Sequence, residues 1–87
     1  MKAKYHFEMM ELDDGLVAVP VGDGAEKFHG VLKVNETAAS ILKLLAADTT
    51  EKEIVNALLQ EYSGQKEQIE EYVHAFVEKM KSEGIVE

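Results

Sequence analysis

The chain has 87 residues, the length of one small domain, which leaves no room for a second hydrophobic core. Apolar residues make up 46% of it, enough for one compact core, which argues against intrinsic disorder. Seventeen acidic side chains face nine basic ones, all of them lysine, so the net charge is -8. Because phosphate recognition depends on clustered cations, and above all on arginine, this composition disfavours nucleic acids and anionic membranes as partners.

Two further absences limit the chemistry and the location that we expect. The sequence contains no cysteine, which excludes disulfides, thiolate metal sites, iron-sulfur clusters and thiol nucleophiles. The first residues lack the apolar core of a signal peptide, and no apolar run is long enough to span a membrane. We therefore expect a cytoplasmic domain.

The first part of the sequence predicts three short strands. Side chains alternate over residues 5–12, residues 13–15 (Asp-Asp-Gly) predict a turn, and residues 16–21 predict the returning strand. A second turn is expected at residues 22–24, followed by a third strand over residues 28–34. Connections this short cannot carry a parallel crossover, so we expect a mostly antiparallel sheet.

After the third strand the hydrophobic period changes to three and four, which predicts helices. Asn35 is expected to cap the first helix, which ends at residues 48–50. Thr50 and Glu53 have the spacing of a capping box, in which the hydroxyl and the carboxylate each accept a hydrogen bond from an otherwise unpaired amide. A second helix is therefore expected from Thr50 to the stop signal at residues 63–64.

The third helix is expected over residues 65–83, with Gly84 as its C-cap, and Ile85 and Val86 then form a short strand or dock on the sheet. Three strands followed by three helices predict an α+β fold of the winged helix-turn-helix type, as a single domain over residues 1–87. The side chains expected in its core are Ala39, Ile41, Leu42, Leu45, Ile54, Val55, Leu58, Ile69, Val73, Val77 and Met80.

The residues that carry catalysis or hold metals in other proteins do not form a recognisable pattern. His6, His29 and His74 lie far apart, and none has a second ligand at helical spacing, so no metal site and no cofactor are predicted. The Gly-x-Gly segment at residues 22–24 has no third glycine and opens no helix. The glutamates of the third helix lie mostly opposite its apolar stripe, where solvation explains them. We therefore expect a binding protein and not an enzyme.

An arrangement of three strands and three helices suits two kinds of binding protein. A winged-helix regulator would read DNA with its third helix or act as a protein adaptor, but residues 65–83 carry five glutamates against three lysines, which repels phosphate. The second kind accepts an extended peptide at an open sheet edge, and the charge does not oppose it. Because an open edge also pairs with a second copy, a homodimer through that edge is a further expectation.

Several segments in the last two thirds of the chain occur in a specific order. They are FHGVLKVNETAA (28–39), ILKLL (41–45), TEKEIV (50–55), EY (61–62), VHAFV (73–77) and GIV (84–86). Together they resemble the PqqD family over about residues 28–86, whereas the first two strands resemble it only in pattern. One departure is Leu42, where members of the family often carry tryptophan.

This resemblance implies a peptide chaperone, or recognition element, for ribosomally made and post-translationally modified peptides. Such a protein holds the leader of a precursor peptide and presents it to a modifying enzyme, commonly a radical SAM enzyme. The resemblance also implies that the leader adds as a strand beside the third strand, in a groove walled by the third helix. The implied peptide-binding residues are His29, Gly30, Val31, Leu32 and Lys33 on the strand and Tyr72, Ala75, Phe76 and Lys79 on the helix.

Some of these residues have two interpretations. Gly30 either lets a peptide backbone approach closely or forms a bulge before the helix. Tyr72 and Phe76 lie at core spacing, so each belongs either to the core or to the groove. Lys33 and Lys79 are expected to pair with acidic leader residues in an otherwise negative molecule.

Overall fold

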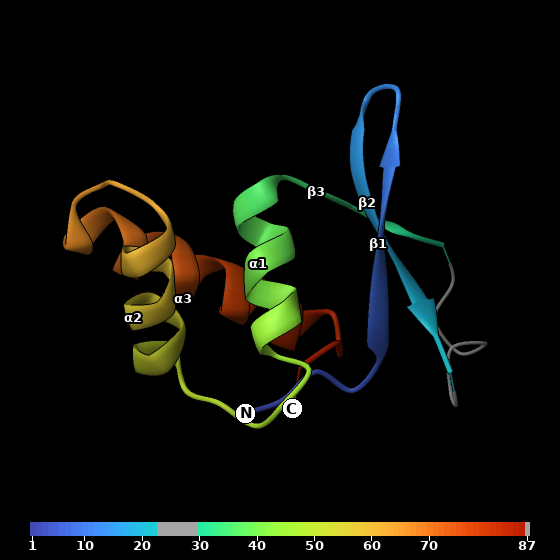
Figure 1. Cartoon of the computed structure of the whole chain (residues 1–87). Helices are drawn as coiled ribbons and strands as arrows, with labels where there is room; N and C mark the ends of the chain where they lie inside the picture. The colour runs from blue at the N-terminus through green and yellow to red at the C-terminus, as the bar shows by residue number, and fades with distance from the viewer. Residues whose placement is uncertain (23–29, 87) are drawn as a thin grey trace.

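A computed structural model describes residues 1–22 and 30–86 and confirms the predicted α+β fold (Figure 1). Within the described residues, the sheet is followed in sequence by the helices. The elements are β1 (His6–Leu12), β2 (Gly15–Val21), β3 (Leu32–Val34), α1 (Glu36–Leu44), α2 (Glu51–Glu61) and α3 (Lys66–Ser82). None of the described helices is both long and apolar enough to cross a membrane.

The sheet is antiparallel, with strand order β1-β2-β3. β1 and β2 pair along their whole length across the predicted turn, where Gly15 has a φ of 132°. β3 pairs only with residues 16–18 of β2 and begins at Leu32, later than the predicted start of the third strand. Gly30 has a φ of 98°, which is incompatible with a regular strand, and residues 28 and 29 lie outside the described part of the chain.

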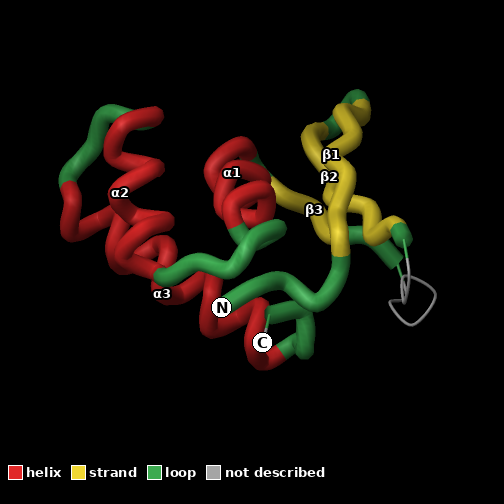
Figure 2. The backbone as a smooth tube through the Cα atoms, turned by 60° about the horizontal axis from the view of Figure 1, so that its bottom comes forward, coloured by secondary structure: helices red, strands yellow, loops and turns green. Residues whose placement is uncertain are grey.

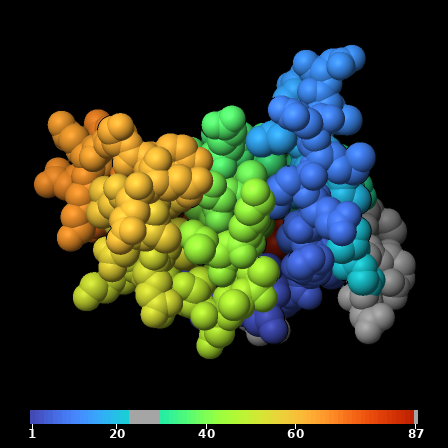
Figure 3. Space-filling model, in the orientation of Figure 1, coloured from blue at the N-terminus to red at the C-terminus, as the bar shows by residue number. Residues whose placement is uncertain are grey.

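All three helices lie on one side of the sheet. α1 stands between the sheet and the packed pair of α2 and α3, as two views of the chain show (Figures 1 and 2). The side chains of β1 alternate as predicted, because Phe7 and Met9 are half-buried whereas Glu8 and Met10 are exposed. The turn end of the β1–β2 hairpin projects beyond the helices (Figure 3).

The hydrophobic core lies where the sheet and the three helices meet. The predicted core residues are buried except for Ile69, which is half-buried and packs against the core. Ala18 of β2 is also fully buried and brings the inner face of the sheet into the same cluster. The largest fully buried side chains are Ile41, Leu45, Ile54, Leu58, Val73, Val77 and Ile85.

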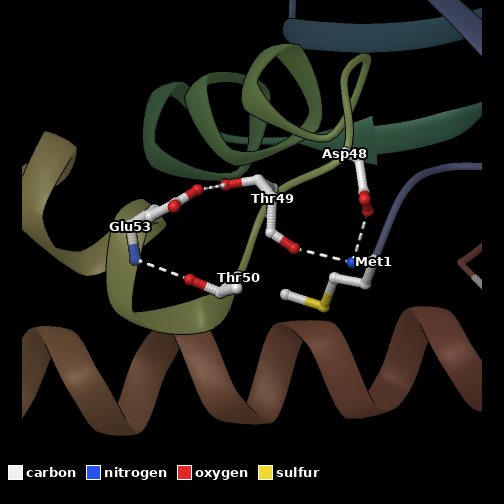
Figure 4. Close-up of polar contacts among 5 residues, drawn as sticks. All are labelled: Met1, Asp48, Thr49, Thr50 and Glu53. Atoms are coloured by element: carbon white, nitrogen blue, oxygen red, sulfur yellow. Dashed lines mark hydrogen bonds and ion pairs between the residues drawn. The ribbon is translucent and has the colours of Figure 1, made fainter.

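Side chains start the first two helices as predicted, with one difference. Asn35 Oδ1 accepts a hydrogen bond from the Ala38 amide (2.8 Å), and Thr50 Oγ1 accepts one from the Glu53 amide (3.2 Å). The prediction that the Thr50 amide donates a hydrogen bond to the Glu53 carboxylate is wrong. Glu53 Oε2 instead accepts a hydrogen bond from the Thr49 hydroxyl (2.9 Å), so only half of the capping box forms (Figure 4).

The two ends of the chain lie side by side and close the core. Gly84 has a φ of 75° and ends α3, after which Ile85 and Val86 are buried. Ala3 forms an isolated antiparallel bridge with Val86, and the Lys4 amide donates to the Ile85 carbonyl (2.7 Å). The closing residues therefore dock and pair with the first residues of the chain.

The terminal ammonium group of Met1 joins the first residues to the connection between α1 and α2. It donates hydrogen bonds to Asp48 Oδ1 (2.8 Å) and to the Thr49 carbonyl oxygen (2.7 Å) (Figure 4). The hydrogen bond from this ammonium, with its positive charge, lowers the pKa of Asp48 below the ordinary value of 3.8.

We expect Leu45→Ala to lower the free energy of unfolding by about 2–5 kcal/mol, because Leu45 is fully buried where α1 ends and its truncation leaves a cavity. Leu12→Ala is the matched control. Leu12 is 49% exposed at the end of β1, so its loss should change the stability by about 0.5 kcal/mol. Urea unfolding followed by circular dichroism measures both, and equal losses would contradict the position of the core.

The Asp48 contact should make stability depend on pH in the acid range. Because the pKa of Asp48 is lowered in the folded chain, the ion pair stabilises it above the ordinary aspartate pKa, and this contribution disappears as the pH falls through the folded-state pKa. The effect is small, since Asp48 is 85% exposed. In thermal unfolding, Asp48→Asn should be slightly less stable than the wild-type chain at neutral pH and equally stable in acid. Acetylation of the terminal amine should cause the same small loss at neutral pH and no loss in acid. A difference that persists in acid would contradict this account.

Candidate functional site

The outer edge of β3 is open within the described part of the chain. β3 is the last strand of the sheet, and no backbone hydrogen bond among residues 1–22 and 30–86 uses its second edge. Leu32 and Val34 pack against the core, whereas Lys33 between them is exposed. An unpaired edge presents backbone donors and acceptors at strand spacing, so it can pair with an added extended segment.

One flank of α3 offers apolar surface near the end of this strand. Val73 and Val77 are fully buried under the helix, whereas Tyr72 beside them is 38% exposed and Phe76 is half-buried against the core. The Tyr72 and Phe76 rings stack with centroids 6.5 Å apart and an angle of 11° between their planes. Phe76 therefore belongs to both the core and the surface, and Tyr72 belongs mainly to the surface.

Tyr72 connects α3 to the junction between β3 and α1. Its hydroxyl donates a hydrogen bond to Asn35 Oδ1 (3.2 Å), the oxygen that also caps α1. Asn35 directly follows β3, so this contact brings the helix flank to the end of the strand. Sequence reasoning assigned Asn35 to capping alone, because nothing local links two residues 37 positions apart.

The other predicted site residues are spread over this region. Ala75 and Lys79 are exposed on α3, at spacings that place them on the flank of Tyr72 and Phe76. Val31, just before β3, is 54% exposed although it is apolar. His29 lies outside the described residues.

Gly30 and Lys33, both predicted on the strand side of the groove, are explained by their own conformation and contacts in the structure. Apart from its chain neighbours, no described residue has an atom within 4 Å of the position of a Cβ on Gly30, so its positive φ explains the glycine better than a close contact with the described residues. Lys33 alternates with inward-facing neighbours and pairs with Asp14 (3.1 Å), an exposed aspartate of the β1–β2 turn. Its side chain therefore points away from the helices.

Charge is divided between the two flanks of α3. Glu70, Glu71 and His74 line a hollow of about 570 Å³ between α2 and α3, in which His74 Nδ1 lies 3.0 Å from Glu51 Oε1. The flank of Tyr72 and Phe76 carries Lys79, and its carboxylates lie at its border, at positions 71, 78 and 83. The middle of the site therefore presents mainly apolar surface in a molecule with a net charge of -8.

The described residues provide hydrogen-bonding and apolar groups at this site. Within residues 1–22 and 30–86, no polar or charged side chain is buried, and no group of three or more histidines and carboxylates could hold a metal ion. An open backbone edge beside an apolar helix flank can bind an extended chain, since it supplies main-chain partners and contacts for alternate side chains.

Comparison with known proteins finds one family and two related folds. Residues 15–86 match the family described as "Coenzyme PQQ synthesis protein D (PqqD)", and no curated protein matches the chain. A structure of TbiB1 in complex with the TbiA(beta) leader peptide has a TM-score of 0.70 at 22% identity, covering 100% of this chain and 95% of that one. A structure of lasso peptide synthetase B1 complexed with the leader peptide has a TM-score of 0.66 at 23% identity, covering 97% and 93%. Both likenesses show the fold.

We expect Tyr72→Phe to lower the free energy of unfolding by about 0.5–1.5 kcal/mol through loss of its hydrogen bond to Asn35. Asn35→Ser provides the control, because serine still caps α1 but is too short to reach Tyr72. In the Asn35→Ser background, Tyr72→Phe should cause almost no further loss in urea unfolding. The same loss in both backgrounds would show that the two residues are not coupled.

Proposed function

The chain belongs to the PqqD family, and from this premise we propose that residues 1–87 form one peptide-recognition domain that binds the leader of a ribosomally made precursor peptide and is not itself an enzyme. The observation that carries the proposal is the open edge of β3 beside the apolar flank of α3. The two similar folds, whose names include a bound leader peptide, support it.

We propose that the leader binds by strand addition along β3. Main-chain hydrogen bonds set its register, and its side chains then point alternately toward α3 and away from it. Tyr72 and Phe76 provide exposed or half-buried apolar surface for the side chains that face the domain. Burial of that surface contributes about 25 cal/mol per Å².

Electrostatics adds a weaker preference to this contact. Lys79 supplies positive charge on the flank, so an acidic leader residue near it is favoured. Lys33 is a poorer partner, since it pairs with Asp14 on the other side of the sheet. Because both lysines are exposed, their contribution to affinity is small and falls with salt.

The bound leader would then be presented to a modifying enzyme, a radical SAM enzyme or another enzyme that acts on peptides. A leader along β3 leaves the β1–β2 hairpin and the outer side of α2 open for that enzyme, and Figure 3 shows both exposed. The glutamates of α3 face solvent, which favours this function over DNA binding. The open β3 edge also suits a homodimer, in which a second copy would compete with the leader.

The test is titration of the chain with a fluorescein-labelled leader of the precursor peptide encoded beside its gene, followed by anisotropy. We expect saturable binding to the wild-type chain and a loss of about tenfold or more in Ala75→Glu, because a carboxylate there would be desolvated by the peptide. Asn56→Glu is the matched control, since it adds the same charge at an exposed position on α2 and should leave the affinity unchanged.

The two parts of the proposal fail separately in this experiment. No binding to the wild-type chain would contradict the function, and equal losses in the two variants would contradict the place of the groove. Backbone amide shifts in residues 30–34 on addition of the peptide provide the direct readout of strand addition, and circular dichroism checks that both variants fold.

A further inference from the structure

The face of the sheet that points away from the helices lies outside both the core and the proposed groove. All three helices lie on the opposite face, as two views of the chain show (Figures 1 and 2). Phe7, Met9 and Ala18 pack toward the helices, so the side chains that alternate with them point outward. This outer face consists of Glu8, Met10 and Leu12 on β1, Val17 and Val19 on β2, and Lys33 on β3.

Exposed apolar side chains are concentrated on the outer face. Among the described residues four large apolar side chains are exposed, and of these Tyr72 belongs to α3. Met10 and Leu12 lie on the outer face and are 50% and 49% exposed. Val31 is 54% exposed and directly precedes Leu32, whose side chain packs against the core, so alternation favours the outer side for Val31. A cluster of exposed apolar side chains on a small domain is typical of a contact with another macromolecule.

The outer face is one surface across the three strands. The register pairs Met10 with Val17 and Val17 with Lys33, and directly paired residues of antiparallel strands carry their side chains on the same face. Val17 in the middle is 6% exposed, whereas Met10 and Lys33 on either side are exposed. The turn end of the hairpin, where Leu12 lies, projects beyond the helices and is accessible to a partner (Figure 3).

The border of the outer face is acidic. Glu8 is exposed on β1, and Asp13 and Asp14 are exposed in the turn. Lys33 pairs with Asp14 (3.1 Å), so it leaves Glu8 and Asp13 uncompensated. A complementary partner therefore has an apolar centre bordered by lysine or arginine. This charge disfavours a second copy of the chain, whose own outer face has the same acidic border.

The size of the outer face favours a transient partner that also contacts the bound peptide. Three strands of up to seven residues cover roughly 14 by 24 Å, which is much less than the roughly 800 Å² that each partner of a stable interface buries. A peptide added along β3 would widen the sheet by a fourth strand. Every second side chain of that peptide would lie on the outer side, next to Lys33.

We propose that the peptide-modifying enzyme docks on the outer face, through an apolar surface bordered by cations, and that the bound leader forms part of the contact. The inference rests on the proposed function and names the surface from which the leader is presented. It assigns the enzyme to the sheet and not to the outer side of α2, which the leader also leaves open. Because the enzyme contacts both the sheet and the leader, each of the two ligands raises the affinity for the other by the same factor.

The test measures binding of the chain to the purified peptide-modifying enzyme encoded beside its gene, by biolayer interferometry. Met10→Lys places a cation on the apolar part of the outer face, and Asn56→Lys adds the same charge at an exposed position on α2 as the matched control. Leu12→Ala removes apolar surface at a position where little stability is at stake. The leader is added without the segment that the enzyme modifies, so that the active site of the enzyme does not hold it.

We expect Met10→Lys to bind the enzyme about tenfold more weakly and Leu12→Ala about threefold more weakly, with Asn56→Lys within about twofold of the wild-type chain. Saturating leader should raise the affinity of the wild-type chain for the enzyme about tenfold. All three variants should bind the labelled leader as the wild-type chain does, which also shows that they fold. If Met10→Lys loses leader binding, Leu12→Ala decides, and an unchanged affinity of that variant for the enzyme would overturn the docking surface.

The docking surface and the proposed function fail separately. If the leader binds but the enzyme does not, or if Met10→Lys and Asn56→Lys bind the enzyme equally, the docking surface is overturned and the function stands. Enzyme binding that the leader does not change overturns the shared contact. If sedimentation equilibrium shows a wild-type dimer that Met10→Lys dissociates, the outer face belongs to a second copy and the proposal is overturned. If the leader does not bind the wild-type chain, the proposed function is overturned as well.

Discussion

The side-chain oxygen of Asn35 is the point on which the geometry of the site depends. It accepts a hydrogen bond from the Ala38 amide, which starts α1 directly after β3, and another from the Tyr72 hydroxyl. The same atom therefore sets where β3 ends and where the aromatic flank of α3 lies beside it. A capping residue that is ordinary in sequence thus also fixes the distance between the two walls of the proposed groove.

α3 has three surfaces, and this division explains how an acidic protein keeps a mainly apolar site. Buried residues such as Val73 and Val77 hold the helix on the core, and glutamates such as Glu70 lie toward α2 and solvent. The remaining flank carries Tyr72 and Phe76, next to the open strand edge. Because carboxylates are costly to desolvate, their position at the border of this flank matters as much as the aromatic rings in its middle.

Most of the secondary structure could be predicted because its signals are local. Turn residues, alternation and helix caps each act within a few residues, and the positions of Gly15, Asn35, Thr50 and Gly84 agree with the structure. The errors arose where neighbouring groups compete. The Thr49 hydroxyl binds the Glu53 carboxylate that a capping box would use for the Thr50 amide, and the positive φ of Gly30 delays the start of β3.

The sequence by itself determined the order of the elements, the buried stripes, the acidic charge and, through its resemblance, the family. Only the tertiary structure decided that Lys33 points away from the helices to Asp14 and that Tyr72 reaches Asn35. The physical reason is the separation along the sequence between the groups that interact. Caps and periodicity depend on neighbours within one or two turns, whereas these contacts join side chains 19 and 37 residues apart, and their geometry exists only once the core has packed.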